Sequence, residues 1–92
     1  MTNMFKMISP EDLNTRTISL LQNKWSKVES HFYIQTNKSE RRVVAKSLLG
    51  VSSLGIRKGD DINFIIDHED EIKLERDKNI IIQGVREVFG GE

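Results

Sequence analysis

Two polar residues stand where helices are expected to begin, and each of their side chains could play more than one role. Ser47 directly precedes the apolar run 48–54, and Asn14 precedes a longer stretch with apolar residues at helical spacing. Serine and asparagine are favoured N-caps, because the side-chain oxygen accepts a hydrogen bond from a free backbone N–H of the first turn. A serine hydroxyl can also carry a phosphoryl group, which adds about −1.5 to −2 charges beside the positive end of the helix. The residues alone favour a plain cap at both positions.

The composition limits the kinds of catalysis and ligand binding that this chain can perform. Cysteine is absent, which excludes disulfides, thiolate catalysis and cysteine-ligated metals. The two histidines, His31 and His68, are not spaced as a metal pair, so we expect both at the surface and expect no metal or other cofactor. Fourteen basic and fourteen acidic residues cancel, which gives no global electrostatic argument for binding nucleic acid or an anionic membrane. The mixed charges of Lys38–Arg42 predict a solvated hairpin rather than a nucleic-acid site.

The length of 92 residues predicts a single domain spanning 1–92. The N-terminal residues contain no apolar run long enough for a signal peptide, and no stretch approaches the roughly 20 apolar residues of a membrane span. We therefore expect a cytoplasmic protein, with a small core and modest stability.

The spacing of apolar residues predicts seven elements in the order β-α-β-β-α-β-α. Apolar residues from Ile18 to Val28 recur at three- and four-residue steps, which indicates one buried helix face, and Leu20 widens that face. Alternating apolar residues from Ile62 to Ile66 indicate a strand with one buried face. The expected strands cover residues 4–8, 32–34, 43–45 and 62–66, and the expected helices cover 14–28, 47–54 and 78–89.

The last third of the chain has the least regular pattern. Residues 67–77 are highly charged, so we expect a loop there. Gly84 should weaken the helix that follows by about 1 kcal/mol relative to alanine, and Gly90–Gly91 should end it. The β-branched triple Ile80–Ile82 also fits a strand. Short connections and one hairpin predict an α+β fold, with one four-stranded, mainly antiparallel sheet and helices on one face.

The stretch Lys46–Gly55 resembles the helix-start segment of the histidine-containing phosphocarrier proteins (HPr) of the sugar phosphotransferase system. In that family the segment carries a regulatory serine, which corresponds to Ser47. Upstream, Leu13–Thr17 lies where the family has its active-site run Gly-Leu-His-Ala-Arg-Pro, and the phosphoryl-carrying histidine is Asn14 here. The resemblance extends from residue 4 to residue 89 and implies the family's open-faced β-sandwich.

Asn14 cannot replace that histidine chemically. Phosphoryl transfer needs an imidazole nitrogen with a lone pair, whereas the asparagine amide nitrogen is delocalised into its carbonyl. Arg16 matches the motif arginine that contacts the phosphoryl group, and beside a helix N-terminus it could hold phosphate or a partner's carboxylate, although an ordinary solvated arginine fits equally well. Thr17 stands where the family has proline and Asp12 where it has glycine, and the charge of Asp12 weakens an anion site.

The short helix after Ser47 has more apolar side chains than a two-turn helix can bury. In the HPr family the outward apolar residues of this helix dock partners, and methionine is common at two positions where this chain has Leu49 and Ser52. Ser52 makes the apolar patch smaller. The competing interpretation is that Leu48 and Leu49 belong to the core.

The resemblance implies a regulatory binding module rather than an enzyme or a phosphocarrier. It is closest to the catabolite-repression HPr homologues, in which the active histidine is also replaced while the serine remains. The HPr kinase/phosphorylase would phosphorylate Ser47, and the product would act as corepressor for a LacI-type carbon-catabolite regulator. The alternative is a divergent HPr paralogue that serves as an unphosphorylated protein-interaction module. The residues expected to bind an anion or a partner are Arg16, Lys46, Leu48, Leu49 and Ser52.

Overall fold

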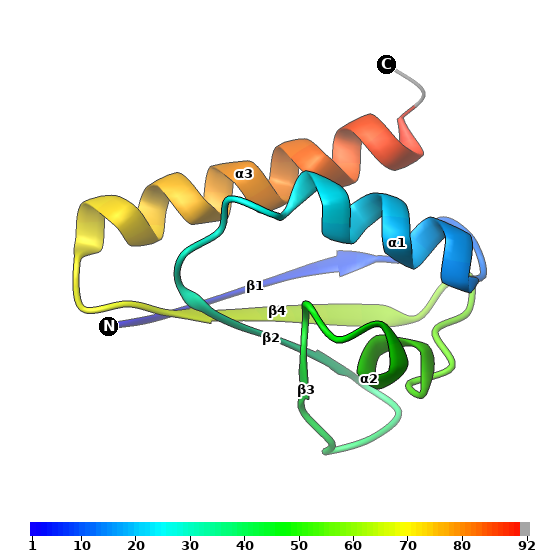
Figure 1. Ribbon diagram of the computed structural model, residues 1–92. Coiled ribbons are helices and arrows are strands. Elements are labelled where there is room, and N and C mark those ends of the chain that lie inside the picture. Colours follow the sequence, from blue (N-terminus) through cyan, green and yellow to red (C-terminus); the bar gives the residue numbers. More distant parts are fainter. Residues whose placement is uncertain (91–92) are drawn as a thin grey trace.

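The computed structural model describes residues 1–90, which form a four-stranded sheet and three helices (Figure 1). The strands are β1 (Thr2–Ile8), β2 (His31–Thr36), β3 (Val43–Val44) and β4 (Asp61–Asp67), and they lie in the order β1-β4-β2-β3 across the sheet. The helices are α1 (Thr15–Lys24), α2 (Leu48–Ser52) and α3 (Glu71–Phe89). Every pairing between these strands is antiparallel. The α+β fold class and the element order expected from the sequence are confirmed.

The core lies between one face of the sheet and the helices α1 and α3, which run side by side over it (Figure 1). Trp25 stands edge-on against Phe32 and Phe64, with ring centroids 5.0 and 5.8 Å apart. The alternating residues of β4 point at the same layer, and burial of this apolar cluster is the main force holding the sheet to the helices. Within residues 1–90, no helix is both long enough and apolar enough to cross a membrane.

Helix α1 is shorter than the apolar spacing predicted. It ends at Lys24 with Trp25 as its C-cap, and the Val28 N–H donates to the Trp25 carbonyl at 3.0 Å in the turn that follows. Val28 is still buried, so the spacing identified the buried residues correctly and the end of the helix wrongly. Leu20 is 46% exposed and therefore does not widen the buried face.

The expected loop over 67–77 is wrong, because α3 already begins at Glu71. Asp70 is its N-cap and accepts hydrogen bonds from two backbone N–H groups of the first turn at 2.9 and 3.3 Å. The first turns of α3 are mostly exposed, and Leu74 is their one buried apolar side chain. A solvated helix of this kind shows little apolar periodicity. The alternative of a strand at Ile80–Ile82 is also wrong, since this triple lies within α3.

Gly84 has a packing role that the sequence did not indicate. A Cβ at this position would lie 2.8 Å from the Lys24 Cβ and 3.0 Å from the Trp25 Nε1, so only glycine lets α3 approach α1 this closely. Farther along, α3 ends at Phe89 with Gly90 as its C-cap, which confirms that end of the helix, while Gly91 lies outside the described residues.

Candidate functional site

Asn14 is fully used as the N-cap of α1. Its backbone is extended (φ −105°, ψ 173°), and its Oδ1 accepts from the Thr17 N–H at 2.9 Å and from the Thr17 hydroxyl at 3.1 Å. The preceding residue is also held, because the Leu13 N–H donates to the Ile56 carbonyl at 3.0 Å. The side chain at position 14 therefore closes the first turn of the helix, and its nitrogen has no lone pair with which to attack phosphorus.

Arg16 and Asp12 lie around this helix start with different surroundings. Arg16 is exposed on the first turn of α1. The Asp12 carboxylate accepts from the Lys58 backbone N–H at 2.8 Å and lies 4.0 Å from the Arg57 guanidinium. Asp12 thus joins the loop before α1 to the turn before β4. Asp12 also keeps a negative charge in the loop that leads into α1, which does not favour an anion there.

Ser47 is the N-cap of α2, as the sequence predicted. Its backbone is extended (φ −89°, ψ 113°), and its Oγ accepts from the Gly50 N–H at 3.0 Å. A Cβ at position 50 would lie 3.1 Å from the Ser47 Oγ, so glycine there leaves room for the cap. Ser47 is an exposed residue. This geometry is that of a structural N-cap.

The outer side of α2 is an apolar surface, which we call the α2 surface and define as Leu48, Leu49 and Ser52. Leu49 is 83% exposed and Leu48 is 37% exposed, whereas Val51 points inward and is only 3% exposed. The interpretation that the two leucines belong to the core is therefore wrong. Both leucines therefore lie at the surface, directly after the Ser47 cap.

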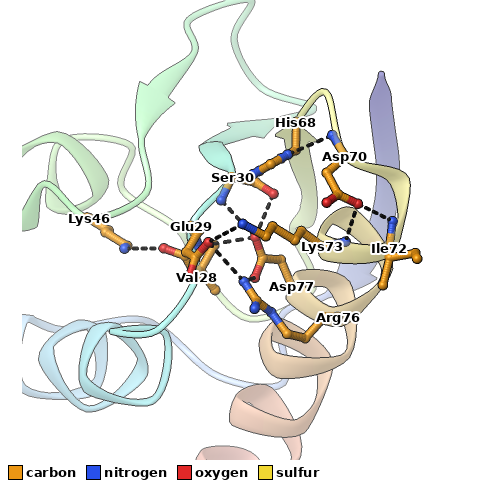
Figure 2. Close-up of polar contacts among 10 residues, drawn as sticks. All are labelled: Val28, Glu29, Ser30, Lys46, His68, Asp70, Ile72, Lys73, Arg76 and Asp77. Atoms are coloured by element: carbon orange, nitrogen blue, oxygen red, sulfur yellow. Dashed lines mark hydrogen bonds and ion pairs between the residues drawn. The ribbon is translucent and has the colours of Figure 1, made fainter.

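Lys46 does not extend into solvent as an open anion ligand. Its Nζ donates to the Val28 carbonyl at 2.6 Å, across the gap between the start of α2 and the end of α1 (Figure 2). The backbone just before it is anchored as well, because the Ala45 carbonyl accepts from the Gln22 side chain at 3.0 Å and the Ala45 N–H donates to the Phe32 carbonyl at 2.9 Å.

The hairpin that was expected to be solvated is fastened to the connection between α2 and β4. Lys38 forms an ion pair with Asp60 at 2.7 Å and donates to the Gly55 carbonyl at 2.8 Å, and Arg41 bonds to the Ser53 hydroxyl. The Lys38 bond, together with the Arg57 N–H, lowers the pKa of the Asp60 carboxyl. These contacts hold the loop between β2 and β3 beside the C-terminal end of α2.

The two histidines lie close to the junction of β4 and α3. His31 is the first residue of β2 and pairs in register with Asp67. The His68 Nδ1 accepts from the Asp70 N–H at 2.8 Å. In the part of the chain that the structure describes, no three histidine, aspartate or glutamate side chains are grouped so that they could hold a metal ion.

Asp77 is the polar residue that sequence reasoning missed. It is completely buried, and its Oδ2 accepts from the Ser30 N–H at 2.7 Å, the Ser30 hydroxyl at 2.6 Å and the Glu29 N–H at 3.1 Å (Figure 2). Burial opposes ionisation, but the bonds from Ser30, Glu29 and Arg76 outweigh it and lower the pKa of this carboxyl. The sequence did contain one indication of this role: Asp77 lies three residues after Leu74 and four before Ile81, on the same buried face of the helix.

Comparison with known proteins agrees with this geometry. The family profile described as the PTS HPr component phosphorylation site matches residues 1–76. The histidine-containing phosphocarrier protein from a mycoplasma is 25% identical over 92% of this chain and 93% of its own, with a TM-score of 0.75. No protein in the curated set matches.

Two further solved structures share the fold. The HPr-C-His structure from Thermoanaerobacter tengcongensis is 23% identical over the whole of this chain and 98% of its own, with a TM-score of 0.73. The phosphocarrier protein HPr from Bacillus anthracis str. Ames is 23% identical over 86% of this chain and 95% of its own, with a TM-score of 0.66. Proteins of this family are phosphocarriers rather than catalytic enzymes. The profile match over residues 1–76, together with the shared fold, shows that this protein belongs to the HPr family of the phosphotransferase system.

Proposed function

We propose that this chain is a regulatory binding module of the phosphotransferase system and does not carry phosphoryl groups at position 14. The observation that carries the proposal is the Asn14 cap, whose oxygen is bound to Thr17 and whose nitrogen is not nucleophilic. The module needs neither a cofactor nor a catalytic residue. It comprises a single domain over 1–92 and works in the cytoplasm.

Regulation acts through the Ser47 hydroxyl. In the proposed step the Ser47 oxygen attacks the γ-phosphorus of ATP held by the HPr kinase/phosphorylase. The new oxygen–phosphorus bond forms as the bond to the leaving ADP oxygen breaks, and the hydroxyl proton passes to a base on the kinase. Exposure of Ser47 and its place beside the α2 surface support this assignment. The added charge changes which partner fits there.

The partner of the phosphorylated form is a LacI-type regulator, and the α2 surface supplies the apolar contact. Leu48 and Leu49 are exposed beside Ser47, so one partner can bury the leucines and pair a basic group with the phosphoserine. Arg16, on the neighbouring helix α1, is exposed and is the basic residue that meets an acidic group of the partner.

A second function is supported by the environment of Lys46 and Asp12. The Lys46 ammonium is bound to the Val28 carbonyl, and Asp12 places a carboxylate beside the start of α1. Both arrangements disfavour an anion site and fit an interaction module that works without phosphorylation. The two functions differ only in whether Ser47 is modified.

One experiment separates them. The chain is incubated with ATP and the kinase, beside an authentic HPr in the same tube, and both are read by intact mass. We expect one acid-stable phosphate that Ser47→Ala abolishes and that Ser19→Ala, a matched change at an exposed serine of α1, retains. If the authentic HPr is modified while this chain is not, the unphosphorylated module becomes the function that fits.

A further inference from the structure

Three consecutive residues at the end of the α1–β2 connection, Val28–Ser30, accept or donate hydrogen bonds on two opposite sides (Figure 2). We call this segment the 28–30 bridge. On one side stands Lys46, the residue before the α2 cap, and on the other stands Asp77 of α3. The bridge is therefore the physical connection between the start of α2 and the middle of α3.

On the α2 side, the bridge is held by a single hydrogen bond. The Lys46 Nζ donates to the Val28 carbonyl at 2.6 Å. Lys46 directly precedes Ser47, so a phosphoryl group on the Ser47 oxygen would place its charge one residue along the chain from an ammonium group carried on a flexible four-carbon stem. The backbone on the other side of Lys46 is held at Ala45 by Gln22 and Phe32, so the Lys46 side chain can turn without moving β3.

On the α3 side, the bridge is held by hydrogen bonds and ion pairs from several groups. The Asp77 carboxylate accepts from the backbone N–H groups of Glu29 and Ser30 at 3.1 and 2.7 Å. The Glu29 carboxylate lies 3.4 Å from Arg76 and 3.6 Å from Lys73, which are also on α3. A shift of the bridge must therefore change the bonds made by the two amides to Asp77.

We propose that Lys46 couples the modification of Ser47 to the packing of α3 through the 28–30 bridge. A phosphoryl group on Ser47 withdraws the ammonium of Lys46 from the Val28 carbonyl, and the bridge then opens more often at Glu29 and Ser30. The proposal rests on the proposed function only in taking phosphoserine 47 as the modified state.

The physical basis is competition between two acceptors. A phosphoryl group carries about −1.5 to −2 charges and forms charge-assisted bonds roughly twice as strong as those to a neutral acceptor. The Val28 carbonyl is neutral, so its bond to the Lys46 ammonium is weaker than a bond from the same ammonium to a phosphoryl oxygen. Because coupling between two sites is reciprocal, weakening the Asp77 grip should also alter the freedom of Lys46.

The test uses the full chain with phosphoserine placed at position 47 during synthesis, so that no kinase is needed. Amide hydrogen exchange is measured by NMR at Glu29 and Ser30, relative to amides in the paired strands β1 and β4, which report global opening. We expect exchange at Glu29 and Ser30 to rise roughly fivefold, the equivalent of one lost hydrogen bond of about 1 kcal/mol, while the strand amides stay protected.

A substitution at Lys46 tests whether the rise in exchange depends on its ammonium group. Lys46→Met should produce the same local rise without phosphoserine, and phosphoserine in that background should add nothing further, as in a double-mutant cycle. Lys27→Met is the matched control, because it removes an exposed lysine directly before the bridge and should leave both amides unchanged.

Two results would overturn the coupling. One is unchanged exchange at Glu29 and Ser30 when phosphoserine is present. The other is an equal rise from phosphoserine with and without the Lys46 ammonium. Since the phosphoserine is built in, failure of the kinase to modify Ser47 would contradict the proposed function and leave this measurement intact. A chain that the kinase modifies but whose bridge does not respond would contradict the coupling alone.

Discussion

The Trp25 indole donates its Nε1–H to the Ile81 carbonyl at 3.2 Å, so a side chain of α1 bonds to the backbone of α3 inside the core. The contact forms only because Gly84, three residues farther along α3, leaves space for the ring. This contact holds the two helices that cover the sheet close together, so a larger side chain at position 84 should disturb their packing.

Gly84→Ala should destabilise the protein although alanine is the better helix former. The substitution gains about 1 kcal/mol of helix propensity but forces a Cβ against Lys24 and Trp25, and overpacking of this kind costs about 1–3 kcal/mol. We expect a net loss of up to about 2 kcal/mol in the free energy of urea unfolding. Gln83→Ala, at an exposed position of the same helix, is the control and should change stability little. A stabilised Gly84→Ala chain would contradict the close approach.

Asp77→Asn should cost about 2–3 kcal/mol in the free energy of unfolding at neutral pH, because the amide replaces a charged acceptor facing several donors. The pKa of Asp77 is lowered in the folded state. Its contribution to stability is therefore complete above the unfolded value of about 4 and is lost as pH falls through the folded value. Unfolding measured from pH 7 to pH 2 should show a shallower acid limb in Asp77→Asn than in the parent.

Glu75→Gln serves as the matched control for that measurement, since Glu75 is exposed on the same helix. Its acid limb should follow the parent. Identical pH profiles for Asp77→Asn and the parent would mean that the carboxylate is not what holds the 28–30 bridge.

The chain should not accept a phosphoryl group from phosphoenolpyruvate and the first enzyme of the phosphotransferase system. Asn14 has no phosphorylatable nitrogen, and Asn14→His alone should restore little transfer because Asp12 and Thr17 also depart from the family motif. Transfer is read as an acid-labile phosphoramidate, with an authentic HPr as the positive control. Appearance of that species on the parent chain would refute the proposed loss of carrier chemistry.

Ser47→Ala should lower stability by only about 1 kcal/mol, the usual cost of losing an N-cap. The lost contact is the bond from the Gly50 N–H to the Ser47 Oγ. Ser52→Ala, on the exposed side of α2, should stay within about 0.5 kcal/mol of the parent. Thermal melting of both variants measures this loss of stability. If the loss at Ser47 is small, a failure of phosphorylation or partner binding in Ser47→Ala cannot be explained by unfolding.

Local contacts are what the sequence by itself determined. Asn14 bonds to Thr17 and Ser47 bonds to Gly50, each three residues away, so residue type and spacing sufficed to predict both caps. The order of elements followed for the same reason, because apolar periodicity along the chain selects strand or helix locally. The antiparallel sheet followed from short connections.

Long-range contacts were decided only by the tertiary structure. Lys46 meets Val28 from 18 residues away, and Asp77 meets Ser30 from 47 residues away. No local pattern encodes such pairs, because they depend on how the helices and their connections pack over the sheet. The same holds for the charged start of α3: a helix that buries one apolar side chain in its first turns has the composition of a loop, and only its packing partner makes its helical state evident.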